Sequence, residues 1–142
     1  MAAPLCNLGN LAIPVDILQK EFSMGEKEKK IFEAHTIVGA GILQDIEAMG
    51  EENGFIHMAG EIAQYHHENW DGSGYPKGIK EEAIPLSAQI VSIVGEYCLL
   101  TNNCIEGRAL KEEAMEVMEQ ESGKKYNPEI MWILKRIVKQ LQ

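Results

Sequence analysis

Residues 66–78 read His-His-Glu-Asn-Trp-Asp-Gly-Ser-Gly-Tyr-Pro-Lys-Gly and join the end of a predicted helix to a loop. Upstream, apolar residues recur at steps of three and four, which predicts a helix over 55–68. Its buried stripe consists of Ile56, Ala59, Ala63 and His66. His66 therefore points where the core residues point, and His67 lies beside it. Two adjacent histidines alone would indicate a solvated helix end. A functional role for them is therefore indicated only by the loop residues that follow.

The loop after the histidines is rich in residues that favour turns. Glycine allows positive φ and lets the backbone approach a neighbour closely, and a residue before proline favours an extended step. The residues of this candidate recognition loop are Asp71, Gly72, Gly74, Tyr75 and Pro76. Because replacing such glycines is sterically costly, the pattern indicates that the loop's shape is used, either for recognition or to cap the helix.

This stretch resembles the signature of the HD-GYP family, the cyclic di-GMP phosphodiesterase branch of the HD superfamily. The similarity is almost residue for residue over 66–68, 71–78 and 84–91, and it extends over essentially the whole chain. In this family the Gly-Tyr-Pro loop resembles an interaction surface, including for diguanylate cyclase domains, and its side chains carry no metal ligand. The resemblance implies an HD-domain-like helical bundle.

The composition is that of a soluble globular protein. The chain has 142 residues, of which 45% are hydrophobic and 25% charged, enough for a single domain over residues 1–142. We expect no membrane segment, because no apolar run approaches the roughly 18 residues that a span needs. A net charge of −9 argues against nucleic-acid binding. Three scattered cysteines, Cys6, Cys98 and Cys104, indicate a reduced, cytoplasmic chain.

Hydrophobic periodicity predicts an all-α fold of about six helices. They are expected from Pro14, over 26–49 after a capping pattern at Ser23 and Glu26, over 55–68, from Pro85, over 110–118, and from Asn127-Pro128. The residues expected on their buried sides are Phe32, His35, Gly39, Ile42, Ile46 and Met49; Leu86, Ile90, Ile93, Tyr97 and Leu100; Leu110, Ala114, Val117 and Met118; and Ile130, Ile133, Leu134, Ile137 and Leu141.

The resemblance implies a metal site. A catalytic HD-GYP domain holds two or three iron or manganese ions through histidines and aspartates on several helices. His35, His66 and His67 match ligand histidines of the family. Without that resemblance, a histidine on an apolar stripe such as His35 would be read as a core residue.

The same resemblance places other residues at two ligand positions and a phosphate-binding position. Residues 6–14 match the family's His-Asp-x-Gly-Lys-x-x-Ile-Pro segment. Cys6 stands at the ligand His, Asn7 at the bridging Asp, and Asn10 at the phosphate-binding Lys. Asparagine is close to aspartate in shape, but it is neutral and a poor metal ligand.

Four further positions depart from the family downstream. Gly95 stands at the last ligand Asp, and Cys98 at a second Asp three residues on. Cys104 and Gly107 stand at the phosphate-binding Arg and Lys. With both carboxylate ligands replaced, the sequence predicts no catalytic residue and no binuclear metal centre.

Three interpretations are open. The first is a catalytically degenerate HD-GYP domain, without cofactor or cyclic di-GMP hydrolysis, that acts as an interaction module in cyclic di-GMP-related signalling. Its partner would be a diguanylate cyclase-type domain or a second copy of itself. The second is a residual site for one Zn or Fe ion built from His35, His66, His67 and Cys6. The third is an active metal-dependent cyclic di-GMP phosphodiesterase with an altered or mononuclear site, which would need ligands such as Glu68 or Glu96.

The beginning of the chain also departs from the family, in which one or more helices precede the segment matched by residues 6–14. Here five residues precede Cys6, which indicates an N-terminal truncation relative to the family. Apolar surface on the helices over 32–49 and 86–100 should then stay uncovered, so we expect a homo-oligomer.

Overall fold

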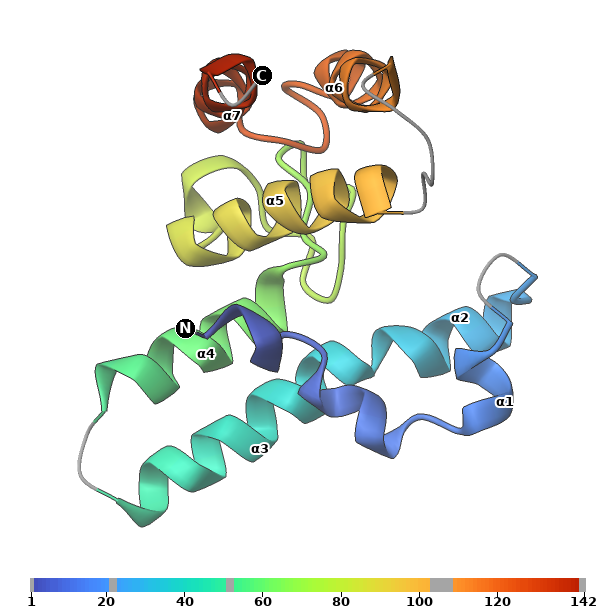
Figure 1. The fold of residues 1–142 in the computed structure, drawn as a ribbon. Helices are drawn as coiled ribbons and strands as arrows, with labels where there is room; N and C mark the ends of the chain where they lie inside the picture. The colour runs from blue at the N-terminus through green and yellow to red at the C-terminus, as the bar shows by residue number, and fades with distance from the viewer. Residues whose placement is uncertain (1, 21–22, 51–52, 103–108, 141–142) are drawn as a thin grey trace.

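The computed structural model describes residues 2–20, 23–50, 53–102 and 109–140, which form an all-helical domain (Figure 1). The α-helices are α1 (Val15–Leu18), α2 (Glu26–Glu33), α3 (His35–Met49), α4 (Gly54–Tyr65), α5 (Leu86–Asn102), α6 (Ala109–Gln120) and α7 (Pro128–Gln140). Short 3-10 helices are η1 (Ala3–Leu5), η2 (Leu8–Ala12) and η3 (Glu81–Ala83). Within these ranges the structure has one isolated β-bridge, between Ser122 and Tyr126, and no strand. The predicted all-α fold is confirmed, and the described part of the chain contains seven α-helices in place of about six.

The helices form two groups that meet near the end of α4. In one group α3 and α4 lie side by side, and the N-terminal segment with η2 crosses α3 (Figure 1). In the other group α5 packs against α6 and α7 (Figure 1). The long loop between α4 and α5 lies where the two groups meet. None of the described helices is both long and apolar enough to cross a membrane.

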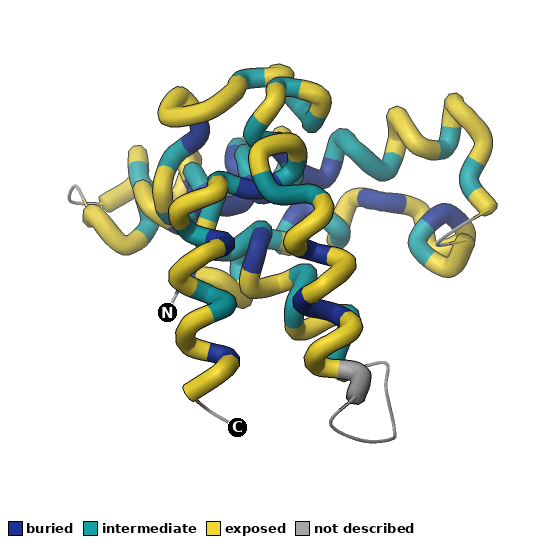
Figure 2. Tube along the Cα trace, turned by 90° about the horizontal axis from the view of Figure 1, so that it is seen from above, coloured by how far each residue is buried: buried dark blue, intermediate teal, exposed yellow. Residues whose placement is uncertain are grey.

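Each group has its own hydrophobic core, and buried positions gather where helices meet (Figure 2). The first core consists of Ala2, Leu43, Ala59, Ile62 and Ala63. The second consists of Ile93, Met115, Met118, Tyr126, Met131 and Val138. Ile93 is 1% exposed, and burying such a side chain fully is worth about 1.5–3 kcal/mol.

The helix predicted over 26–49 is interrupted at Ala34, where α2 ends and α3 begins. Two side chains at the break bond to carbonyl groups three residues earlier, which competes with the regular helical pattern. His35 Nδ1 lies 2.6 Å from the carbonyl oxygen of Phe32, and Thr36 Oγ1 donates to Glu33 over 2.8 Å. The break places His35 at the start of α3.

The capping residues of α2 also differ from the prediction. The backbone N–H of Gly25 donates to the Glu28 carboxylate over 3.0 Å, so the capping pair is Gly25 and Glu28. Ser23 donates instead to the carbonyl of Lys20. By contrast, Asn127 caps α7 as expected, because its side chain accepts the backbone N–H of Glu129 over 2.9 Å.

Several residues predicted to be buried are exposed. They are Ile46, Met49, Leu86, Ile90, Val117, Ile133 and Ile137. The cause is that each of these helices packs over only part of its surface, so a neighbouring stripe is buried instead. In α3 the buried residues are His35, Thr36, Gly39, Ala40 and Leu43, all in the first nine residues of the helix, and Met49 near its end is 87% exposed. The predicted core residues Leu110 and Leu141 lie outside the described side chains.

Gly9 sets the distance between the N-terminal segment and α3. A Cβ atom at this position would lie 1.9 Å from the carbonyl oxygen of His35 and 2.7 Å from the backbone nitrogen of Gly39. Real Cβ atoms do not come that close to backbone atoms, so only glycine fits here without a shift. The close approach brings residues 6–10 beside the first turn of α3.

We expect Gly9→Ala to lower the free energy of unfolding by at least about 2 kcal/mol, because the added Cβ must push η2 away from α3. The matched control is Gly41→Ala in the middle of α3, where an added Cβ meets nothing within 4 Å. Alanine favours a helix over glycine by about 1 kcal/mol, so the control should be neutral or slightly stabilising. Urea unfolding of both variants measures the difference. Equal stability of the two variants would contradict the packing described here.

Candidate metal site

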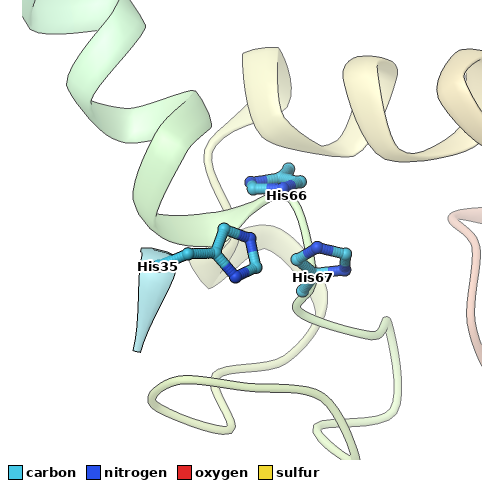
Figure 3. Close-up of side chains that lie close together, drawn as sticks. All are labelled: His35, His66 and His67. Atoms are coloured by element: carbon cyan, nitrogen blue, oxygen red, sulfur yellow. The ribbon is translucent and has the colours of Figure 1, made fainter. Parts of the chain in front are cut away.

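Three histidines converge at the junction of the two helical groups (Figure 3). His35 begins α3, while His66 and His67 directly follow the last turn of α4. Each ring offers a nitrogen atom, and these atoms all lie within 4.8 Å of one another. His35 and His66 are buried, and His67 is half-buried. The structure thus brings together the three histidines that the sequence singled out.

The backbone fixes the tautomer of two of these rings. His35 Nδ1 lies 2.6 Å from the carbonyl oxygen of Phe32, and His66 Nδ1 lies 2.9 Å from that of Ile62. A carbonyl oxygen can only accept, so each Nδ1 carries a proton and donates it. The Nε2 atoms of both rings are buried and have no hydrogen-bond partner among the described residues. Metal-bound histidines are held in this way, with the second ring nitrogen bonded to a carbonyl or carboxylate.

Burial also keeps the rings neutral at physiological pH. It lowers the pKa of His35, and it lowers the pKa of His66 to about 4, where the backbone bond to Ile62 acts in the opposite direction. Burial and the neighbouring charge of His66 lower the pKa of His67 to about 3. Neutral imidazole is the form that binds metal ions.

The donor set fits one divalent ion and does not fit two. Three neutral imidazoles suit Zn(II) or Fe(II) and leave a position open. Among the described residues no Asp, Glu or Cys joins the three histidines within the 4.8 Å that separates their ligand atoms. A binuclear centre needs a bridging carboxylate to offset the charge of two cations, and Asn7 supplies none. Cys6 lies near the cluster but outside it, so the predicted four-ligand set is only partly formed.

Glu68 and Glu96, the two carboxylates considered as substitute ligands, do not join the histidine cluster. Each has one oxygen bonded elsewhere, whereas Glu68 Oε2 is buried without a partner among the described residues. Glu68 is buried, and its Oε1 accepts the backbone N–H groups of Lys77 and Gly78 over 2.7 and 3.1 Å. Glu96 forms an ion pair with Lys125 over 3.1 Å. Glu68 thus ties Lys77 and Gly78, at the far end of the loop, to the end of α4, and no motif in the sequence predicted this role.

The recognition loop lies directly on the histidine cluster. The ring of Tyr75 stacks on His67, with centroids 4.8 Å apart and planes inclined by 17°. The backbone N–H of Tyr75 donates to the carbonyl of His67 over 3.1 Å, and the Tyr75–Pro76 peptide bond is cis. Burial raises the pKa of Tyr75, so its hydroxyl stays protonated. The loop therefore positions one of the three imidazoles as well as shaping a surface.

Tight backbone contacts hold the rest of the loop. A Cβ at Gly74 would lie 2.3 Å from the backbone nitrogen of Asn69 and 2.4 Å from the carbonyl oxygen of His67. Gly72 has a φ of 84°, and the Asp71 carboxylate accepts the N–H of Ser73 over 2.9 Å. These close contacts and the positive φ explain why glycines occur at positions 72 and 74. They agree equally well with a loop that caps the end of α4 and with a loop that serves as a recognition surface.

A pocket of about 510 Å³ opens beside His66 and His67, within the usual range of small-molecule sites. Its walls come from the N-terminal segment, the recognition loop, α5 and the segment before α7. Its lining residues include Cys6, Asn7, Tyr75, Ser92, Gly95, Glu96 and Lys125.

Three of the seven positions that depart from the family pattern line this pocket. Cys6, Asn7 and Gly95 line it, and an added Cβ at Gly95 would meet nothing within 4 Å. Asn10 lies in η2, and its Oδ1 is buried without a partner among the described residues. Cys98 is exposed on α5. Cys104 and Gly107 lie outside the described residues.

Sequence reasoning missed Lys125 and Ser92, which also line the pocket. Lys125 precedes the helix α7 by only three positions and lies 58 positions after His67 (125 − 67). No motif marks it, and only the fold brings it beside the histidines.

A family model described as an HD domain matches residues 1–130. The chain belongs to the HD-domain family. Members of this family normally bind metal ions, which agrees with a histidine cluster that fits one ion. The predicted fold class and family are thereby confirmed.

Curated relatives of this HD domain are phosphodiesterases. The cyclic di-GMP phosphodiesterase of Thermotoga maritima is 35% identical over 141 residues, which cover 99% of this chain and 37% of that protein. The cyclic di-GMP phosphodiesterase response regulator RpfG of Xanthomonas campestris is 34% identical over 143 residues, covering 100% of this chain and 36% of its own length. The chain thus spans little more than a third of the curated relatives it matches.

The fold of this chain is similar to that of a solved structure. The cyclic GMP-AMP-specific phosphodiesterase of Vibrio cholerae superposes with a TM-score of 0.64 at 21% identity, over 88% of this chain and 27% of that one. Together the relatives support the HD-GYP branch. They favour the phosphodiesterase interpretation over the degenerate signalling module, and the degeneracy itself stays a prediction.

The stability of the metal-free protein should depend on His66 below neutral pH. The unfolded state takes up a proton near pH 6.5, whereas the folded state does so only near pH 4, so acid favours unfolding between these values. Between pH 7 and pH 5 the cost from His66 should be on the order of 2 kcal/mol.

We expect His66→Gln to remove this part of the pH dependence, measured by urea unfolding in the presence of a chelator. The control is His57→Gln, at a histidine whose side chain is 66% exposed, which should keep the full dependence. An unchanged slope in His66→Gln would contradict the burial of a neutral His66.

Proposed function

We propose that this HD domain binds one divalent metal ion through His35, His66 and His67 and acts on the phosphodiester bond of a cyclic dinucleotide. The observation that carries the proposal is the pair of buried Nε2 atoms on His35 and His66, which have no partner among the described residues and lie within the histidine cluster. Leaving such groups unpaired in the interior costs free energy, and a bound cation would remove that cost. The substrate class follows from the names of the relatives.

Each residue of the site has a separate task in this proposal. When bound, the ion would supply Lewis-acid polarisation of a phosphodiester oxygen. Phe32 and Ile62 orient two imidazoles through their carbonyl groups, and Tyr75 holds the plane of His67 by stacking. On the pocket wall, the amide of Asn7 and the hydroxyl of Ser92 can donate hydrogen bonds to phosphate oxygens.

The first prediction from this proposal concerns stoichiometry. After zinc-replete expression and removal of loosely bound metal, elemental analysis should give about one ion per chain, because three imidazoles form one site. His66→Ala should lose the ion and the thermal stabilisation that comes with it. His57→Ala, outside the cluster, should keep both. Two tightly bound ions per chain, or full retention by His66→Ala, would be incompatible with the site described.

The second prediction concerns hydrolysis of cyclic di-GMP. One ion without a bridging carboxylate cannot stabilise both the attacking and the leaving oxygen, so turnover should be far slower than with two ions. We expect slow, metal-dependent release of linear product, measured by chromatography after long incubation. The activity should disappear in His66→Ala and survive in His57→Ala. Activity that persists in His66→Ala would show that another site is responsible.

A specific observation favours a second candidate, the catalytically degenerate interaction module. Asn7 and Gly95 line the pocket at positions where the family resemblance calls for carboxylates, and neither can provide one. At the same time α5 exposes apolar side chains at Leu86, Ile90 and Leu99, which could meet a second copy or another protein domain. Absence of turnover in a metal-loaded, folded protein would favour this candidate over the first.

A further inference from the structure

Lys125 occupies a fixed position at the edge of the pocket. Its backbone N–H donates to the carbonyl of Glu121 over 2.9 Å, and its carbonyl accepts the N–H of Trp70 over 3.2 Å. The neighbouring carbonyl of Lys124 accepts the N–H of Asp71 over 2.8 Å. The segment before α7 is thus tied to the beginning of the recognition loop, and the side chain of Lys125 starts from a well-defined place.

The ammonium group of Lys125 lies beside the histidine cluster and is held by one carboxylate. Its Nζ is 3.1 Å from Glu96 Oε2 and 5.4 Å from the centre of the Tyr126 ring. The charge of Lys125 contributes to the lowered pKa of His67. Its effect is smaller than those of burial, His66 and His35. The side chain is 36% exposed, so the pair with Glu96 is open to solvent on one side.

The balance of charge in the pocket makes Lys125 important for an anion. Among its described lining residues, Lys125 is the only cation and Glu96 the only acid. The chain carries a net charge of −9, so a phosphate group approaching from solvent meets general repulsion. Asn10 is neutral where the family resemblance calls for a lysine, which leaves the phosphate without that partner.

We propose that Lys125 binds the phosphate of the cyclic dinucleotide, and that Glu96 holds the ammonium group until the phosphate replaces it. This inference rests on the proposed function, and it names a residue and an exchange of ion pairs that the family pattern does not contain. The exchange keeps the lysine charged and paired in both states, so the cost of removing it from water is met before the ligand arrives. Glu96 therefore competes with the phosphate for the same cation.

The test is calorimetric titration of zinc-loaded protein with cyclic di-GMP. Lys125→Gln should weaken binding at least about tenfold, because a charge-assisted hydrogen bond is lost. Glu96→Gln should strengthen binding several-fold, because the competing carboxylate is removed. The control Lys124→Gln changes the net charge by the same amount at an exposed neighbour and should leave the affinity unchanged. Zinc content is measured in every variant and should stay the same.

The outcomes separate this inference from the proposed function. If the zinc-loaded native chain does not bind cyclic di-GMP, both are overturned. If the native chain binds and Lys125→Gln binds equally well, only the role of Lys125 is overturned. If Lys124→Gln weakens binding as much as Lys125→Gln, the effect is one of general charge and the specific contact is rejected. Weaker binding in Glu96→Gln would reject the competition between the carboxylate and the phosphate.

Discussion

The hydrogen bond from His35 Nδ1 to the carbonyl of Phe32 connects the fold to the site. In the fold, this hydrogen bond lies at the break between α2 and α3 at Ala34. On the side of the site, it fixes the proton on Nδ1 and leaves Nε2 directed into the cluster. The contact of Gly9 with the carbonyl of His35 then brings the N-terminal segment against the same turn. A substitution at this turn would therefore alter both the packing of the N-terminal segment on α3 and the orientation of the His35 ring.

The recognition loop forms part of the site, because it contacts the histidines directly. Tyr75 stacks on His67, and Glu68 accepts two backbone N–H groups from the far end of the loop. Because the loop is fastened both to the histidines and to the segment around Lys125, its shape and the geometry of the pocket cannot vary independently. The same contacts give the loop a structural role that does not depend on the residues at positions 7 and 95.

The sequence predicted the helical fold, the capping of α7 by Asn127 and the convergence of His35, His66 and His67, because periodicity and motif spacing report local structure and family membership. It did not predict the break at Ala34, which depends on side chains bonding to carbonyl groups within the helix. It also placed Leu86 and Ile90 in the core, since periodicity marks an apolar stripe without saying whether a neighbour covers it. Lys125 was missed because a contact between segments so far apart in the chain leaves no local pattern.

Gly95 leaves unfilled space on the wall of the pocket. It lies on the pocket wall, and space is open around the Cβ that any other residue would add there. A side chain at this position would start in open space, and Asn7 has nearly the shape of an aspartate. In evolutionary terms, two substitutions on the pocket wall, at positions 7 and 95, would give it two carboxylates, and the backbone at position 95 already has room for the Cβ of such a side chain.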